Sequence, residues 1–171
     1  MKKTIAIAGL GWLGKPLAQH LSFSGYAIKG SVTSQRKATV LEQSGIDTYV
    51  INSTEDGLYG PAQGFLKHVD TLVIMIPPGL RKNTGSDYIL KMSHLLSEIL
   101  TAKVANIIFI SSTAVYSDDQ GKVTEQQIPL PKTQAAKQLY QGAQFFFNTP
   151  GVSTSIVRSG GLIGGERQPV T

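Results

Sequence analysis

The first thirty residues constrain the fold more than any other stretch of the chain. An unbroken apolar segment, residues 4–8, runs directly into Gly9, Gly11 and Gly14, which are spaced Gly-x-Gly-x-x-Gly. An apolar pattern with helical spacing then continues to about residue 24. This order of strand, glycine motif and helix is the one that dinucleotide binding requires. We therefore predict a nucleotide-binding unit here, with a glycine-rich turn of another α/β protein as the alternative.

Each glycine of the motif has a separate expected task. Gly9 permits the tight turn off the strand, Gly11 leaves room for a pyrophosphate, and Gly14 lets the helix pack closely on the strand. The free N–H groups and the dipole at the start of the helix then face the anion. Trp12 and Leu13 stand between these glycines and are predicted to contact the cofactor with them. For Trp12, packing on the edge of the sheet is the alternative.

Apolar runs and helical patterns alternate along the whole chain. The expected strands cover residues 4–9, 27–32, 47–51, 71–76, 107–110 and 153–158. The expected helices cover residues 12–24, 34–44, 62–68, 85–102 and 133–147, with Ser34 capping the second. This alternation predicts an α/β fold, a Rossmann-type doubly wound parallel sheet of about six strands in the order 3-2-1-4-5-6. Ligands are then expected where the strand order reverses, between the carboxyl ends of the first and fourth strands.

The residues after the second predicted strand bear on the choice of cofactor. An NAD site usually has Asp or Glu there to bind the ribose hydroxyls. This chain has Thr33 and Ser34, followed by Arg36 and Lys37, and no carboxylate before Glu42. Hydroxyl groups and a bidentate guanidinium suit the additional phosphate of NADP. We predict that NADP is preferred over NAD; a solvated first helical turn is the alternative.

Composition excludes several other classes of protein. The 171 residues are the size of one domain, and the absence of Cys rules out disulfides and thiolate sites. The three His residues are too widely spaced to predict a metal site. No apolar run approaches the roughly 20 residues that cross a bilayer, so we expect a cytoplasmic protein without a membrane segment. The net charge of +5 is scattered, which favours a small phosphorylated ligand over a nucleic acid.

Two further stretches narrow the family. Residues 110–116 read Ile-Ser-Ser-Thr-Ala-Val-Tyr and resemble the Ser-Ser-x-x-Val-Tyr-Gly signature of extended short-chain dehydrogenases/reductases, the NAD(P)-dependent epimerase/dehydratase group. Residues 158–167 are similar to the Arg-x-x-Gly-Ile-Tyr-Gly-Pro-Gly-Arg loop of that group. The glycine spacing departs from the usual Gly-x-x-Gly-x-x-Gly and is similar to that of atypical subgroups. The resemblance implies a nucleotide-sugar substrate.

The same resemblance implies a catalytic set that is incomplete in this chain. The group uses a Ser on the fifth strand and a Tyr-x-x-x-Lys on the next helix, where Tyr exchanges a proton and Lys lowers its pKa and binds ribose. Ser112 and Lys137 match the Ser and Lys, but Thr133 occupies the place of the Tyr. Tyr140 is one turn beyond Lys137, in the wrong direction. Tyr116 is then the remaining candidate acid, and its alternative role is packing at the end of the strand. For Ser112, the alternative to binding a substrate is a structural role as the last residue of the strand.

Extended members of this group continue beyond the sixth strand into a substrate domain. We therefore expect residues 1–171 to form the NAD(P)-binding domain, truncated after the loop that follows this strand, and to bind cofactor with little or no turnover. A non-catalytic dinucleotide-binding module, such as a redox sensor or a partner subunit, is the alternative. Residues 9–11, Gly-Leu-Gly, and residues 77–79, Pro-Pro-Gly, would also suit a reductase similar to hydroxyacid dehydrogenases, but residues 111–116 have no counterpart in that family. Pro77 is a predicted cofactor contact under either interpretation. Whether the chain forms a homodimer is left open.

Overall fold

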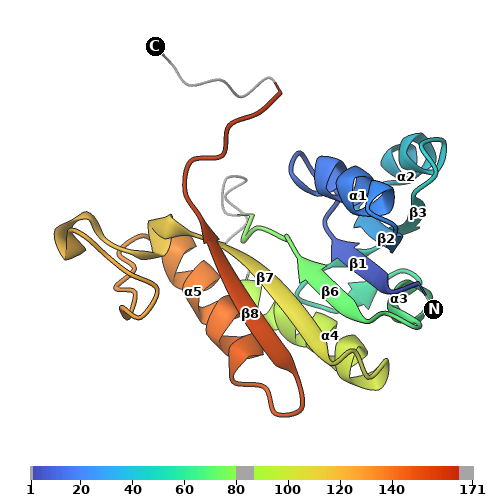
Figure 1. Ribbon diagram of the computed structural model, residues 1–171. Coiled ribbons are helices and arrows are strands. Elements are labelled where there is room, and N and C mark those ends of the chain that lie inside the picture. Colours follow the sequence, from blue (N-terminus) through green and yellow to red (C-terminus); the bar gives the residue numbers. More distant parts are fainter. Residues whose placement is uncertain (1, 80–86, 166–171) are drawn as a thin grey trace.

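A six-stranded parallel sheet forms the centre of the protein, for which a computed structural model describes residues 2–79 and 87–165 (Figure 1). The spatial order of the strands is β3-β2-β1-β6-β7-β8, which confirms the predicted order 3-2-1-4-5-6. The strands are β1 Thr4–Ala8, β2 Ala27–Val32, β3 Asp47–Val50, β6 Thr71–Ile74, β7 Asn106–Ser112 and β8 Ser153–Ser159. The order reverses between β1 and β6, as in other doubly wound sheets.

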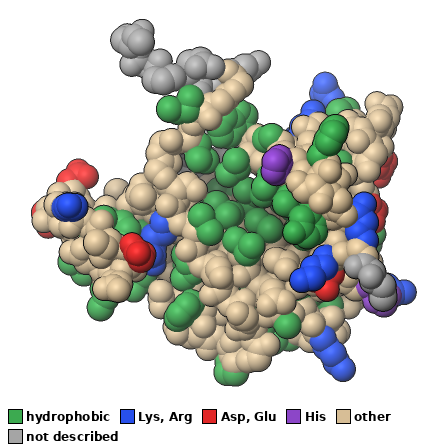
Figure 2. All heavy atoms as spheres, viewed as in Figure 1, with side chains coloured by type: hydrophobic (Ala, Val, Ile, Leu, Met, Phe, Trp, Pro, Cys, Tyr) green, Lys and Arg blue, Asp and Glu red, His purple; other side chains and the backbone are tan. Residues whose placement is uncertain are grey.

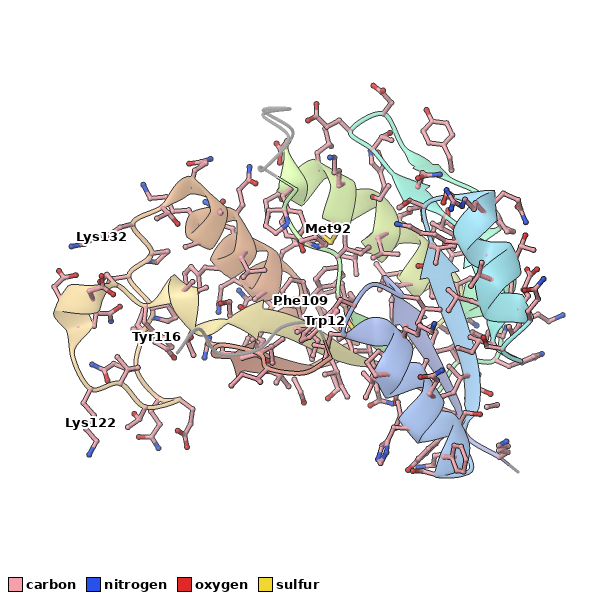
Figure 3. All side chains as sticks on the ribbon, turned by 90° about the horizontal axis from the view of Figure 1, so that it is seen from above. Trp12, Met92, Phe109, Tyr116, Lys122 and Lys132 are labelled. Atoms are coloured by element: carbon pink, nitrogen blue, oxygen red, sulfur yellow. The ribbon has the colours of Figure 1, made fainter. Side chains whose placement is uncertain are left out.

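Helices cover both faces of this sheet (Figure 1). The helices are α1 Gly14–Phe23, α2 Gln35–Glu42, α3 Ala62–Leu66, α4 Tyr88–Thr101 and α5 Gln134–Phe147. The first two pack on one face through a core that includes Ile7 and Ala18, and the other three pack on the opposite face. Met92 of α4 and Phe109 of β7 belong to that second, larger core (Figure 3). Within the described ranges, no helix combines the length and apolar character that crossing a bilayer requires.

Strand β7 has the alternation that decides where its last residues point. Ile107 and Phe109 are buried in the core beneath α4 and α5, whereas Ile108 packs against the core beneath α1 and α2. Successive side chains of a strand point to opposite faces. Ser111 therefore points to the α5 side of the sheet and Ser112 to the α1 side.

The region predicted as the loop 52–61 contains a short antiparallel hairpin, β4 Asn52–Ser53 and β5 Leu58–Tyr59. Side chains fasten this hairpin to α4: the Ser53 hydroxyl donates to the Lys91 carbonyl (2.8 Å), and the His94 Nε2 lies 2.9 Å from the Glu55 carbonyl oxygen. Strands of two residues are too short to produce an alternating pattern. The sequence therefore gave no signal for the hairpin.

Several predicted boundaries and one predicted cap are corrected by the structure. The strand predicted over 71–76 ends at Ile74, and the strand predicted over 107–110 extends over 106–112. Ser34 stands at the N-cap of α2, but its side chain makes no capping hydrogen bond. The helix predicted over 85–102 is α4, which begins at Tyr88 after the N-cap residue Asp87 and ends at Thr101. The predicted start at residue 85 lies outside the described ranges.

Tyr88 fastens the first turn of α4 to the end of β6. Its side chain is fully buried, and its hydroxyl donates to the Ile76 carbonyl oxygen at 2.7 Å. Burial strongly raises the pKa of this phenol, so it stays protonated and remains a donor. Asp87, at the N-cap, accepts from the backbone N–H groups of Ile89 and Leu90. The hydrogen bond of Tyr88 thereby holds the residue pair after β6, Met75 and Ile76, beside the point where the strand order reverses.

Candidate functional site

Two glycines of the motif are required by the packing of the protein itself. Gly9 has φ +106°, and a Cβ on it would lie 3.2 Å from the Met75 carbonyl oxygen. A Cβ on Gly14 would lie 2.5 Å from the Gly9 carbonyl oxygen. The tight turn predicted for Gly9 and the close packing of helix on strand predicted for Gly14 are both present.

Gly11 differs from both of its neighbours in the motif. Its φ is not in the left-handed region, and a Cβ built on it would meet no described atom within 4 Å. Neither its conformation nor the packing of the described residues requires glycine at this position. The space left open there is where a pyrophosphate would approach the backbone, so the residues present fit a dinucleotide.

The backbone around Gly11 is set up to receive an anion. No side chain caps the start of α1, where Leu13 is the N-cap residue, and its first turn holds no acidic residue. An uncapped N-terminus of this kind carries partial positive charge. Ser31 of β2 fixes the loop, since its hydroxyl accepts from the Gly9 N–H (3.2 Å) and its carbonyl accepts from the Leu10 N–H (2.8 Å).

A cavity of about 410 Å³ extends from this loop across the end of β2 to the hairpin. Thr33 and Pro77, both predicted as cofactor contacts, line it. Residues 52–54, Asn-Ser-Thr, also line it and were not predicted. Their position just after the third strand was the signal that could have identified them, because ligands bind beyond the carboxyl ends of the strands.

A second hollow, of about 650 Å³, lies on the α2 side of the glycine motif. Ser34 and Arg36, both predicted contacts, line it together with Lys15 and Lys37. Among the described residues, three cations and no carboxylate therefore border this hollow, and Lys37 borders the first cavity as well. Lys15 was not predicted, and its place in the first turn of α1, directly after Gly14, was the available signal. This region suits a phosphate group.

Trp12 lies between the glycine motif and the terminal stretch that resembles the family loop. Its side chain is 37% exposed, and a Cβ on Gly164 or Gly165 would lie 3.9 Å from its ring atoms. Figure 3 shows Trp12 in the middle of the molecule, at the loop before α1. The structure therefore brings the two predicted motifs side by side. Residues 166 and 167, the last two of the terminal motif, lie outside the described ranges.

Ser112 ends β7 on the α1 side of the sheet. Its hydroxyl oxygen accepts from the Ala114 N–H (3.1 Å) and caps the short 3₁₀ helix η2, Thr113–Val115. The neighbouring Ser111 hydroxyl is buried on the other face, with no hydrogen-bond partner among the described residues. The Ser112 O–H hydrogen stays available to a ligand at the carboxyl edge, because the capping bond uses only a lone pair.

The hydroxyl of Tyr116 is held by groups outside the glycine loop. Arg158 of β8 donates to it from Nη1 (3.2 Å), and its guanidinium carbon lies 5.5 Å from the centre of the Tyr116 ring. The hydroxyl is also 3.4 Å from the Thr124 carbonyl oxygen. In the view of Figure 3, Tyr116 lies toward the loop before α5, well to the side of Trp12. These contacts link β8 to that loop.

Thr133, which the sequence resemblance aligns with the catalytic Tyr of the epimerase/dehydratase group, has a structural task. It is the N-cap residue of α5, and its hydroxyl oxygen accepts from the Ala136 N–H at 3.2 Å. Lys137, one turn later, is exposed. In the described part of the chain, no hydrogen bond joins Lys137 to Ser112 or to Tyr116. The three predicted catalytic residues therefore share an end of the sheet without forming a connected set.

The loop 117–132, which follows Tyr116, is ordered by its own polar groups. The Gln120 Oε1 accepts from the backbone N–H groups of Ser117 (3.1 Å) and Leu130 (3.0 Å) and so joins the two ends of the loop. Asp119 pairs with Lys132 at 2.8 Å, and both side chains are about two-thirds exposed. The hydrogen bond from Lys132, with a second from Ser117, lowers the pKa of Asp119 from 3.8 to about 2. In the described ranges, no three His, Cys, Asp or Glu side chains gather to hold a metal ion.

Comparisons with known proteins agree with this fold. The chain is 38% identical over 170 residues to protein YeeZ of Escherichia coli K12, a match that covers 98% of this chain and 61% of YeeZ. A functionally unknown conserved protein from Silicibacter pomeroyi superposes with a TM-score of 0.76 and 20% identity, over 98% of this chain and 56% of that one. No family model matches the sequence.

A UDP-glucuronic acid 4-epimerase from Bacillus cereus, solved with UDP-glucuronic acid and NAD, superposes with a TM-score of 0.72 and 21% identity. That match covers 91% of this chain and 55% of the epimerase. The chain thus spans between half and two-thirds of the length of each of these proteins. The chain shares its fold with these proteins and with solved structures of a short-chain dehydrogenase/reductase superfamily protein and of a protein assigned to the NAD-dependent epimerases/dehydratases.

Proposed function

We propose that this chain binds a nicotinamide dinucleotide, with NADP preferred over NAD, as the cofactor domain of an epimerase/dehydratase-like protein. The observation that carries the proposal is Gly11, whose missing side chain leaves a space that no described residue fills. A cavity beside it reaches the ends of β2 and β3, where the ribose and base of a dinucleotide would lie.

The described residues divide the binding task between them. The first turn of α1 would hold the pyrophosphate through backbone N–H groups, without help from a side-chain cap. Thr33 and Lys37 line the cavity at the end of β2, where the ribose would lie, and Pro77 lines it near β6. The bound dinucleotide would supply a nicotinamide carbon that accepts or donates hydride.

The preference for NADP rests on the charge around the second hollow. Arg36, Lys15 and Lys37 border it, and no carboxylate of the residues that the structure describes does so. Arg36→Ala should weaken NADP binding by one to two orders of magnitude, or about 1.5–3 kcal/mol, and leave NAD binding nearly unchanged. Calorimetry with both cofactors measures this, and Lys103→Ala, an exposed cation that borders neither hollow, is the matched control. Equal losses for both cofactors would contradict the assignment.

Catalysis by this chain would depend on Ser112, Tyr116 and Lys137, with a nucleotide sugar as the substrate class. Ser112 would orient a substrate hydroxyl or carbonyl and Lys137 would hold ribose, while Tyr116 would have to serve as the acid in place of the missing tyrosine. A positioned acid or base increases the rate of a reaction by about 10²–10⁴-fold, so an acid at the wrong position would lower the rate by a similar factor. We therefore expect cofactor binding with little or no turnover.

A non-catalytic dinucleotide-binding module is the second candidate, and specific contacts favour it. Thr133 is occupied as a helix cap, and Arg158 and the loop 117–132 engage the Tyr116 hydroxyl. Single-turnover hydride transfer from NADPH to a panel of keto-sugar nucleotides separates the two candidates. Thr133→Tyr and Tyr116→Phe are measured alongside. Ready turnover by the unmodified chain that is lost in Tyr116→Phe would establish Tyr116 as the acid and reject the module.

A further inference from the structure

We infer that the amino-terminal end of the sheet carries a second site, which binds a small anion with two or more phosphate groups, such as inorganic triphosphate. This site lies at the opposite ends of β1 and β6 from the proposed dinucleotide site. It is a hollow of about 470 Å³ where these two strands begin and α4 ends. Lys2, Lys3, His68 and Lys103 line it, and all four are exposed. Figure 1 marks the N-terminus at this corner, and Figure 2 shows Lys or Arg side chains gathered there.

Two of these residues have a backbone conformation that non-glycine residues rarely adopt. His68 has φ +58° and Lys103 has φ +57°, and within the described ranges they are the non-glycine residues with positive φ. They come from separate segments, one after α3 and one after α4, yet both line this hollow. Residues held in such strained conformations cluster at functional sites. The side chains at these two positions are therefore the first indication of a ligand.

The ends of α1 and α2 provide a comparison for the end of α4. All three helices end in the same pair of backbone hydrogen bonds, of which the first in α4 runs from the Lys103 N–H to the Leu100 carbonyl oxygen (3.1 Å). At the position of Lys103, α1 has Gly25 and α2 has Gly45, both with positive φ. Glycine adopts this conformation without steric cost. The helix dipole favours a cation near a C-terminus, but a lysine one turn earlier would supply it without strain.

The charge of the hollow is positive. Asp70 is the carboxylate among its described lining residues, and its Oδ2 accepts from the Thr4 N–H at 2.7 Å. Three lysines therefore surround one carboxylate that already bonds to the backbone. Lys67 and His68 line an adjoining hollow of about 390 Å³, so the cationic surface continues beyond the first hollow. Like charges around a concave surface raise the local concentration of a multivalent anion.

The lining of the hollow suits phosphate groups better than a nucleotide base. Its apolar part is formed by Val69 and Ala102, and no aromatic side chain of the described residues borders it. Proteins commonly hold bases by stacking them on aromatic side chains. Lysine ammonium groups bind phosphate as point charges on flexible stems, so they can follow several linked phosphate groups. The expected ligand is therefore a free oligophosphate.

Calorimetry with sodium triphosphate, in magnesium-free buffer of low salt, tests the site. Orthophosphate should bind about tenfold more weakly, because it engages fewer of the lysines. Lys103→Gly should weaken triphosphate binding about three- to tenfold and raise the melting temperature by about 2–4 °C, because it removes a cation and relieves the left-handed conformation. Lys103→Arg should retain both values. Lys122→Ala removes an exposed cation of the loop 117–132 and is the control, with unchanged affinity.

Several outcomes would overturn the inference. No measurable binding of triphosphate, or equal affinity for orthophosphate, would contradict a site for linked phosphate groups. A loss in Arg36→Ala with none in Lys103→Gly would place the triphosphate beside the glycine motif. Equal losses in Lys103→Gly and Lys122→Ala would show that net charge alone matters. ATP binding that is tenfold tighter than triphosphate binding would show that a base is recognised, and a lower melting temperature in Lys103→Gly would remove the conformational argument.

Discussion

The glycine loop after β1 and the polar end of β7 lie at the same edge of the sheet but are built in different ways. In the proposed site the loop would act through backbone atoms of consecutive residues, and its shape is fixed by Gly9, Gly14 and the Ser31 contacts. The β7 end depends on side chains from separate elements, Ser112 on the strand and Lys137 on α5. In the described structure, hydrogen bonds and close packing hold the glycine loop in one conformation, whereas no hydrogen bond connects Ser112 to Lys137.

This contrast has a physical reason. A site made of backbone N–H groups needs only the right local conformation, which a short motif can specify. A proton-transfer site needs a phenol, an ammonium and a hydroxyl held at hydrogen-bond distances by different elements. The sequence resemblance aligns Thr133 with the phenol of such a set, and in the described structure this threonine caps a helix.

The strongest test of the glycine loop is Gly11→Val. We expect the affinity for NADP to fall more than 100-fold, a loss above about 2.7 kcal/mol, because the side chain would occupy the space proposed for the pyrophosphate. The fold should be retained, since that space holds no described atom. Calorimetry and circular dichroism measure the two effects. Gly64→Ala, at an exposed position of α3, is the control, and unchanged affinity in Gly11→Val would contradict the assignment of the loop.

Gly14→Ala should show the opposite behaviour, with a loss of stability as its primary effect. The new Cβ would lie 2.5 Å from the Gly9 carbonyl oxygen, so β1 and α1 must move apart. Such overpacking costs about 1–3 kcal/mol, which corresponds to a fall of roughly 2–12 °C in melting temperature for a domain of this size. Differential scanning calorimetry checks it. A melting temperature equal to that of the unmodified chain would show that the packing of α1 is looser than described.

Thr133→Ala tests whether the residue in place of the catalytic tyrosine serves the fold. Loss of the hydrogen bond to the Ala136 N–H should lower the free energy of unfolding by about 1 kcal/mol, the usual value of an N-cap. Chemical denaturation measures this change. Thr133→Ser keeps a capping hydroxyl and should be nearly as stable as the unmodified chain. If Thr133→Ala and Thr133→Ser lower the free energy of unfolding equally, the capping hydrogen bond does not explain the contribution of Thr133 to stability.

The smallest effect is expected at the loop 117–132. The pKa of Asp119 is lower in the folded protein than in the unfolded chain. The ionised Asp119 therefore contributes to stability at a pH above its unfolded-state pKa, and this contribution is lost as the pH falls through about 2. Lys132→Ala should raise the pKa of Asp119 toward 3.8, as carboxyl-carbon NMR would record. The melting temperature should not change measurably, since both partners are largely exposed. Lys122→Ala, on the same loop (Figure 3), is the control. An equal rise in the pKa of Asp119 in that variant would contradict a specific pairing of Asp119 with Lys132.

Figure 2 shows the face of the molecule on which α1 and β8 lie. Apolar side chains gather in its hollowed centre, between α1 and β8, while charged side chains lie around the rim. Val157 of β8, with 45% of its side chain exposed, points to the α1 side of the sheet, opposite Ile156, which packs against the core beneath α5.

The sequence by itself predicted the order of the six strands and the packing roles of Gly9 and Gly14, which the structure confirms. Both depend on short-range signals: buried parallel strands appear as continuous apolar runs, and a turn that needs Gly9 needs it wherever the rest of the chain lies. It also predicted Thr33, Arg36 and Pro77 as cofactor contacts, and the structure places Thr33 and Pro77 on one cavity and Arg36 on the neighbouring hollow. Their contact with a cofactor stays a prediction.

Only the tertiary structure decided the remaining parts. The hairpin 52–59 exists because α4 supplies partners for it, and no pattern within it predicts those contacts. The hydroxyl of Tyr116 contacts Arg158, which is 42 residues away along the chain. Local sequence fixes conformations, whereas the partner of a side chain depends on which distant elements the fold brings to it.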